Sequence, residues 1–256
     1  MTMTHTQLTQ PLRSAIDRDL AMRLAATEYG RFADLLRSLQ DDDWAKPTAC
    51  VPWDVRTMAA HALGMVEMAA SLREQKRQNK AAAARLAANG GEFIDSLTAL
   101  QVDERVNMTP AEIVARLAVR WPKAATGRKR APGFVRKKTM PLQQLIGDQH
   151  ESWTFGYLID VVLTRDPWMH RIDIARATGA HHELTADHDG VLVADVVVEW
   201  AARHGQPYTL RLTGPAGGEW SDGDGGESIE LDAIDFCATI SGRRHGEGLL
   251  ATAVPF

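Results

Sequence analysis

The sequence predicts an α+β protein in which a helical bundle is followed by a small α/β domain. Up to about Thr178, apolar residues recur every three or four positions, the period of helices that bury one face. After Gly179 the pattern changes to two helices, short strand-like segments and a glycine-rich turn, which is typical of a small α/β unit. We therefore expect two domains, residues 1–184 and residues 185–256.

Composition limits the classes of partner. Of the 256 residues, 45% are hydrophobic and 24% are charged, which is the balance of a globular protein. The formal net charge of −4 gives no overall attraction to nucleic acid or anionic lipid. No apolar run reaches the roughly 20 residues that span a bilayer, and the opening residues lack the apolar centre of a signal peptide. We expect a cytoplasmic protein with no nucleic-acid or membrane partner and with its two cysteines reduced.

The bundle is predicted from a series of helical segments. The apolar period favours helices at Pro11–Leu39, at Val55–Gln78 after an N-cap at Asp54, at Lys80–Leu100 with a break at Asn89-Gly90-Gly91, at Pro110–Trp121, and within Leu142–Leu163. A last bundle helix is predicted at Trp168–Thr178. There Asp166 would be the N-cap and Pro167 the first helical residue.

The C-terminal domain is predicted from the remaining pattern. It comprises a helix at Val191–His204, a strand at Tyr208–Leu212, a glycine-rich hairpin, a strand at Ser228–Leu231 and a helix at Asp232–Ile240.

Three residues are candidates for a metal site. Asp166 and His170 are four positions apart, so on one helix they would project from the same face. His61, on another bundle helix, could join them and leave a coordination position open. The alternatives are that both histidines are hydrogen-bonded core residues and that Asp166 only caps a helix. Asp148, His150 and Glu151 form a second polar cluster, which we expect to be a solvated helix face.

Three motifs in order along the chain carry a resemblance to a known family. PTACVPWDVRTMAAHALG, which includes His61, and WMHRIDIARATG, which begins just after Asp166, resemble the metal-binding helices of the mycothiol-dependent maleylpyruvate isomerases. The closing SGRRHGEGLLATAVPF resembles the end of their C-terminal domain. The resemblance implies a DinB-like four-helix bundle that binds metal, followed by a small SCP2-like α/β domain.

The resemblance also implies roles for particular residues. In the family, a histidine of the second helix and a carboxylate and histidine of a later helix bind a divalent metal, usually zinc. Those positions here are His61, Asp166 and His170. The family usually has the longer glutamate where this chain has Asp166, and Pro167 follows at once, so the third ligand stays open. A family active-site arginine corresponds to Arg243, for which the alternative is a charge that stabilises a helix C-terminus.

The function that the resemblance implies is a metal-dependent, mycothiol-dependent isomerase or S-transferase acting on a small electrophilic substrate. A bound metal lowers the pKa of a thiol or a water, which creates a nucleophile near neutral pH. Mycothiol would then be the thiol cosubstrate. Two alternatives are a metal-dependent hydrolase that uses water in place of the thiol, and a metal-free binding protein for a small ligand on the same fold.

Overall fold

The computed structural model describes residues 16–256, which form two compact units. One unit, here called the bundle, consists of Arg18–Arg136 and Asp166–His182. The other, here called the C-terminal unit, consists of the two described residues before Arg18, of Lys137–Arg165 and of Glu183–Phe256. The chain therefore passes between the units more than once, and residues 137–165 group with the C-terminal unit. The single boundary expected near residue 185 corresponds to the last of these passages.

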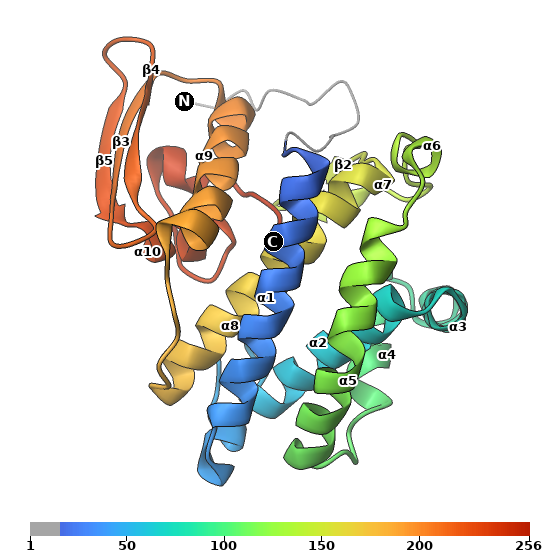
Figure 1. Ribbon diagram of the computed structural model, residues 1–256. Coiled ribbons are helices and arrows are strands. Elements are labelled where there is room, and N and C mark those ends of the chain that lie inside the picture. The colour runs from blue at the N-terminus through green and yellow to red at the C-terminus, as the bar shows by residue number, and fades with distance from the viewer. Residues whose placement is uncertain (1–15) are drawn as a thin grey trace. The chain divides into compact units, whose positions relative to one another are not determined.

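The bundle core lies between four helices: α1 (Arg18–Ser38), α2 (Val55–Ala70), α5 (Pro110–Lys129) and α8 (Leu163–Thr178). Except for Trp44, in the short turn η1 (Asp41–Ala45), these helices supply every buried member of the main apolar cluster. Two further helices, α3 (Leu72–Asn89) and α4 (Phe93–Asp103), pack on α2 and on each other (Figure 1). A helical turn, α6 (Gly133–Arg136), completes this unit.

Helix boundaries in the bundle follow local capping chemistry. The side chain of Asp54 accepts the N–H of Thr57 at 2.7 Å, as predicted for the N-cap of α2. The prediction that one helix runs to Gln78 is wrong, because Ser71 adopts an extended conformation and caps α3 through the N–H of Glu74. The predicted start of the first helix at Pro11 lies outside the described residues.

Helix α8 differs from its prediction in a way that concerns the site. Asp166 is not an N-cap: the chain is helical from α7 (Phe155–Tyr157) through the π turn η2 (Leu158–Val162) into α8, and Pro167 lies inside α8. Proline lacks the N–H that would reach the carbonyl of Leu163. Leu163 is the residue directly after the π turn, so the proline follows a place where the helical hydrogen-bond pattern is already irregular.

The C-terminal unit contains two small sheets. A hairpin of β1 (Gln144–Ile146) and β2 (Gln149–Glu151) stands where a helix was predicted, because Gly147, with a φ of +60°, and the next residue make a two-residue turn. The main sheet has the order β4 (Gly218–Asp222), β3 (Tyr208–Thr213), β5 (Glu227–Asp232), with β3 antiparallel to β4 and parallel to β5. Helices α9 (Val191–His204) and α10 (Ala233–Ile240) lie where predicted, η3 (Ala186–Gly190) precedes α9, and η4 (Gly248–Ala251) follows α10.

These elements confirm the α+β class. In α9, the buried Trp200 contacts the rings of Tyr208 in β3 and Phe236 in α10, which joins the two helices to the sheet. Within the described residues, no helix is long and apolar enough to cross a membrane.

A buried ion pair fixes α8 to α1. The guanidinium of Arg171 donates to both carboxylate oxygens of Glu28, at 2.7 and 3.1 Å, and the two side chains are 1% and 0% exposed. Burying either charge alone would be costly, whereas a two-point pair compensates both. This contact determines how the helix that carries Asp166 and His170 lies in the bundle.

We expect Glu28→Ala to lower the free energy of unfolding by about 3–5 kcal/mol, because it leaves the guanidinium of Arg171 buried without a carboxylate. Urea unfolding followed by circular dichroism measures this. The control is Asp34→Ala on the same helix, which breaks an exposed pair with Arg37 and should cost at most about 1 kcal/mol. Equal losses in the two variants would show that the buried pair does not hold α8.

Candidate metal centre

The first residue of the candidate site, His61, comes from the middle of α2. It lies two turns after the Asp54 cap and is 4% exposed, although it is polar. Its Nδ1 is buried and has no hydrogen-bond partner among the described residues. A buried imidazole with unused hydrogen-bonding capacity calls for a physical explanation.

The other two residues come from α8. Asp166 and His170 lie one turn apart on the same face, because both belong to a continuous helix. Asp166 Oδ1 lies 3.5 Å from His61 Nε2 and 3.4 Å from His170 Nε2. The fold therefore brings together the three residues that the sequence analysis proposed, and it does so within the bundle.

The electrostatics of the group follow from its burial and its charges. Burial opposes ionisation of Asp166, but the imidazoles of His170 and His61 outweigh burial and hold the pKa of that carboxyl far below its usual range. Burial alone would lower the pKa of His170. The carboxylate of Asp166 reverses this and, with Asp173 and Cys50, raises the pKa of His170 well above its usual value. Without a metal, these shifts favour the carboxylate form of Asp166 and the imidazolium form of His170.

The donor set fits a divalent metal. One donor atom from each of His61, Asp166 and His170 lies within 4.8 Å of the other two. Two donors of a tetrahedral zinc ion, each at about 2.1 Å, stand about 3.4 Å apart, close to the two separations from Asp166. Two imidazoles and a carboxylate are a donor set typical of catalytic zinc, which keeps its fourth position open. The shorter aspartate therefore reaches both histidines.

The loop before α2 forms one wall of the site. The ring of Trp53 lies 5.2 Å from that of His61 and 6.0 Å from that of His170, measured between centroids. The loop is closed by a bridge between Pro47 and Asp54. No local sequence signal predicts the position of Trp53 beside both imidazoles.

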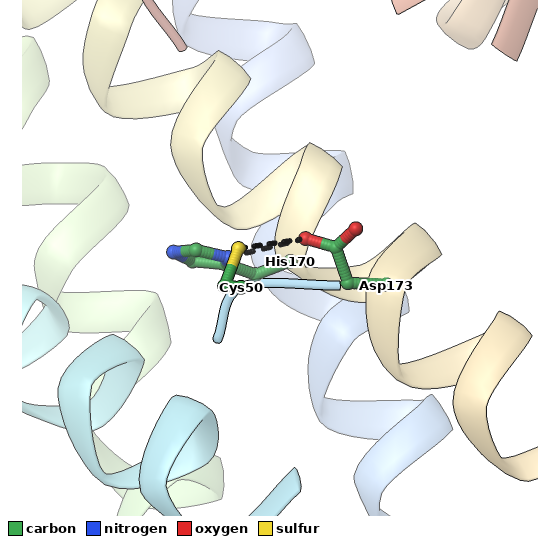
Figure 2. A group of neighbouring side chains, drawn as sticks. All are labelled: Cys50, His170 and Asp173. Atoms are coloured by element: carbon green, nitrogen blue, oxygen red, sulfur yellow. Dashed lines mark hydrogen bonds and ion pairs between the residues drawn. The ribbon is translucent and has the colours of Figure 1, made fainter. Parts of the chain in front are cut away.

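A second group of donors touches the same histidine. Cys50 Sγ donates to Asp173 Oδ2 at 3.6 Å, and the same oxygen lies 3.6 Å from His170 Nδ1 (Figure 2). Cys50 is half-buried and Cys237 is buried, and both are free thiols. From the sequence we expected only that the thiol of Cys50 is reduced. More than a hundred residues separate Cys50 from Asp173, so no local pattern connects them.

The remaining candidates lie in the C-terminal unit. Arg243 follows α10, is half-buried, and its backbone N–H donates to the carbonyl of Ala238 at 2.9 Å. The polar cluster at residues 148–151 is part of the β1–β2 hairpin and not of a helix face. Glu151 is buried against Arg203, with its second oxygen 2.9 Å from the guanidinium, so it is a structural partner of α9.

Comparison with known proteins decides the family. The model of the mycothiol maleylpyruvate isomerase N-terminal domain matches residues 25–175, more than half of the chain and all three residues of the candidate site. The chain belongs to this family. The resemblance seen in the sequence motifs is thereby confirmed.

Solved structures of the same kind share the fold. The chain resembles the mycothiol-dependent maleylpyruvate isomerase and a variant of it with one histidine changed to alanine. In both comparisons the identity is 11%, the match covers 90% of each chain, and the TM-score is 0.54. At this identity the likeness concerns the fold alone. No curated protein matches the chain.

In the metal-free protein, Asp166→Asn should lower the pKa of His170, because burial is then opposed by less negative charge. Proton NMR titration of the histidine ring signals in the presence of a chelator measures the change. In the wild type, the raised pKa means that His170 stabilises the fold below its unfolded pKa of about 6.5, and that this stabilisation is lost as the pH rises through the folded value. The substitution should weaken that dependence.

The control signal in this titration is His204, in the C-terminal unit, whose pKa is lowered chiefly by burial. It should not move in Asp166→Asn. An unchanged pKa of His170 would contradict the assigned contact.

Proposed function

We propose that the protein is a metal-dependent enzyme of the mycothiol-dependent maleylpyruvate isomerase type, acting on a small electrophilic substrate. His61, Asp166 and His170 would hold a divalent metal, with zinc as the first candidate. The observation that carries the proposal is the buried meeting of these three donors at 3.4–3.5 Å, inside the segment that the family model matches. A metal is the simplest reason for a bundle to bury two imidazoles around one carboxylate.

Charge favours an anionic further ligand, such as a thiolate. Two neutral imidazoles and the carboxylate of Asp166 supply one negative charge, so one positive charge of a divalent ion would stay uncompensated. An anionic thiolate complements that charge. When bound, such an ion supplies Lewis acidity that lowers the pKa of a thiol toward neutrality.

The surroundings would strengthen these interactions. His61 and His170 are 4% and 6% exposed, and the indole of Trp53 covers both rings from the loop side. Electrostatic interactions are stronger where water is excluded.

Arg243 is proposed, from the family resemblance, to contact an anionic group of the substrate.

The position of Asp166 supports the metal-dependent proposal over the metal-free alternative. As an N-cap, its oxygens would serve backbone N–H groups, which favoured a binding protein without metal. Inside α8 that role is absent, and Oδ1 faces the two imidazoles instead. A hydrolase would use the same donors with water as the nucleophile, so reaction assays must separate it from the thiol-dependent reaction. The cytoplasmic location stays a prediction from the sequence.

Native-purified wild-type protein should contain close to one divalent metal ion per chain by elemental mass spectrometry. Folded His61→Ala and His170→Ala should lose most of it, because each removes one of three protein donors. The matched control is His150→Ala, in the exposed hairpin of the C-terminal unit, which should keep the metal. A metal-free wild type that also fails to take up zinc on reconstitution would overturn the proposal in favour of a binding protein.

Thiol dependence distinguishes the reaction classes. With an electrophilic alkene such as maleylpyruvate and added mycothiol, an isomerase changes the substrate geometry and leaves the thiol concentration constant, because the thiol that adds is eliminated again. An S-transferase consumes one thiol per product, and a hydrolase turns over without thiol. We expect activity that requires mycothiol and falls at least about 100-fold in His61→Ala. Chromatography of the products with thiol titration measures both quantities.

A further inference from the structure

Three donor atoms meet on the side of His170 that faces away from Asp166. These are Cys50 Sγ, His170 Nδ1 and Asp173 Oδ2, which lie within 4.8 Å of one another. Figure 2 shows the sulfur of Cys50 joined to the carboxylate of Asp173, beside the ring of His170. The two nitrogens of His170 thus face two different groups, Nε2 toward Asp166 and Nδ1 toward Asp173.

The two nitrogens cannot be treated independently. A neutral imidazole carries one proton, and the nitrogen that donates its lone pair to a metal must be the other one. If Nε2 is the metal ligand, the proton of His170 stands on Nδ1. That atom is buried and has no hydrogen-bond partner among residues 16–256, so its N–H needs an acceptor.

Asp173 is placed to be that acceptor. It lies three residues after His170 on α8 and is 3% exposed. Its Oδ2 is 3.6 Å from Nδ1, slightly beyond a hydrogen bond, so a closure of about 0.5 Å would pair the two atoms. Carboxylate–histidine–metal arrangements of this kind fix the ring and its tautomer.

Cys50 contacts the same carboxylate oxygen of Asp173. Its S–H donates to the same Oδ2, and its own position is set by two backbone contacts. The N–H of Cys50 donates to Thr48 Oγ1 at 3.3 Å, and its carbonyl accepts the N–H of Trp53 at 2.8 Å. The loop that places Trp53 over the imidazoles therefore also places a donor on Asp173.

We propose that Asp173 and Cys50 are positioning residues for the metal centre. Asp173 keeps the proton of His170 on Nδ1, and Cys50 orients Asp173 by donating a hydrogen bond to Oδ2. The inference rests on the proposed role of His170 as a metal ligand. Beyond the three donors, it gives Cys50, a loop residue, an indirect effect on metal affinity.

The test is zinc affinity, measured by competition with a chromophoric chelator on the full chain. Asp173→Ala should weaken zinc binding about 10–100-fold. Cys50→Ala should weaken it less than tenfold, and Cys50→Ser, which keeps a donor, should lie close to wild type. The matched control is Cys237→Ala, a buried thiol in the C-terminal unit, which should leave the affinity unchanged.

A second readout separates positioning from a general loss of structure. Long-range proton–nitrogen NMR spectra of the zinc-loaded wild type should show His170 with its proton on Nδ1. In Asp173→Ala that signature should weaken or broaden, while the other histidine signals and the unfolding transition change little. Asp173→Asn, which keeps the shape and a carbonyl acceptor, serves if the alanine variant does not fold, and it should bind zinc more tightly than the alanine variant.

The possible results distinguish this inference from the proposed function. A wild type that takes up no zinc overturns both. Zinc bound through His61 and His170 with an affinity within twofold of wild type in folded Asp173 variants overturns the positioning role alone. Two zinc ions per chain, with the second lost in Cys50→Ala, would show instead that Cys50, His170 and Asp173 hold a metal themselves.

Discussion

The need to compensate buried ionic groups on α8 is the constraint on which the site depends. Charged and titratable side chains project from this helix into places where water cannot solvate them, and an unpaired charge there would destabilise the fold. Within the bundle, those that are nearly fully buried are His170, Arg171 and Asp173. Each lies beside a partner of opposite charge or a titratable group of the same unit, so the helix has one arrangement within the bundle that satisfies them together.

The buried groups of α8 form two separate sets of contacts. Glu28 neutralises Arg171 on the α1 side through a buried two-point ion pair. Asp166 and His170 compensate one another along α8, and His61 joins them from α2. The first pair fixes the position of the helix, whereas the second group is incomplete without a further cation or protons. For this reason we interpret the ion pair of Glu28 and Arg171 as a structural contact, and the group of Asp166 with its two imidazoles as a candidate site.

The sequence predicted elements best where a local cap or turn decides the boundary. The start of α2 follows from the side chain of Asp54, and α10 follows from Asp232, which accepts the N–H groups of Ile234 and Asp235. The predicted start of α8 was wrong because the same local signal occurs in two kinds of structure. Asp166-Pro167 is a common helix start, and only the preceding helical turns make it part of a helix interior.

In the candidate site too, local sequence signals predicted some contacts and missed others. Spacing on one helix predicted that Asp166 and His170 share a face. His61 is 105 positions from Asp166, so it could only be suggested as a residue of another bundle helix, and the family resemblance supported that suggestion. The family match then supplied the fold that brings α2 and α8 together. Neither helix spacing nor the family resemblance predicts the contact between Cys50 and Asp173, because this contact depends on the path of a loop.

The two sides of His170 would give the proposed metal centre two levels of control. Nε2 would belong to the donor set, in which any substitution removes a ligand and the chemistry with it. Nδ1 faces Asp173, which is hydrogen-bonded to Cys50 in the loop before α2, and substitutions there would change how strongly the ring donates without changing what it binds. Because Trp53 follows in the same loop and covers the imidazoles, a shift of that loop would alter the metal affinity and the wall of the site together. Variation in the loop is therefore the means by which this fold could adjust its reactivity while its donors stay the same.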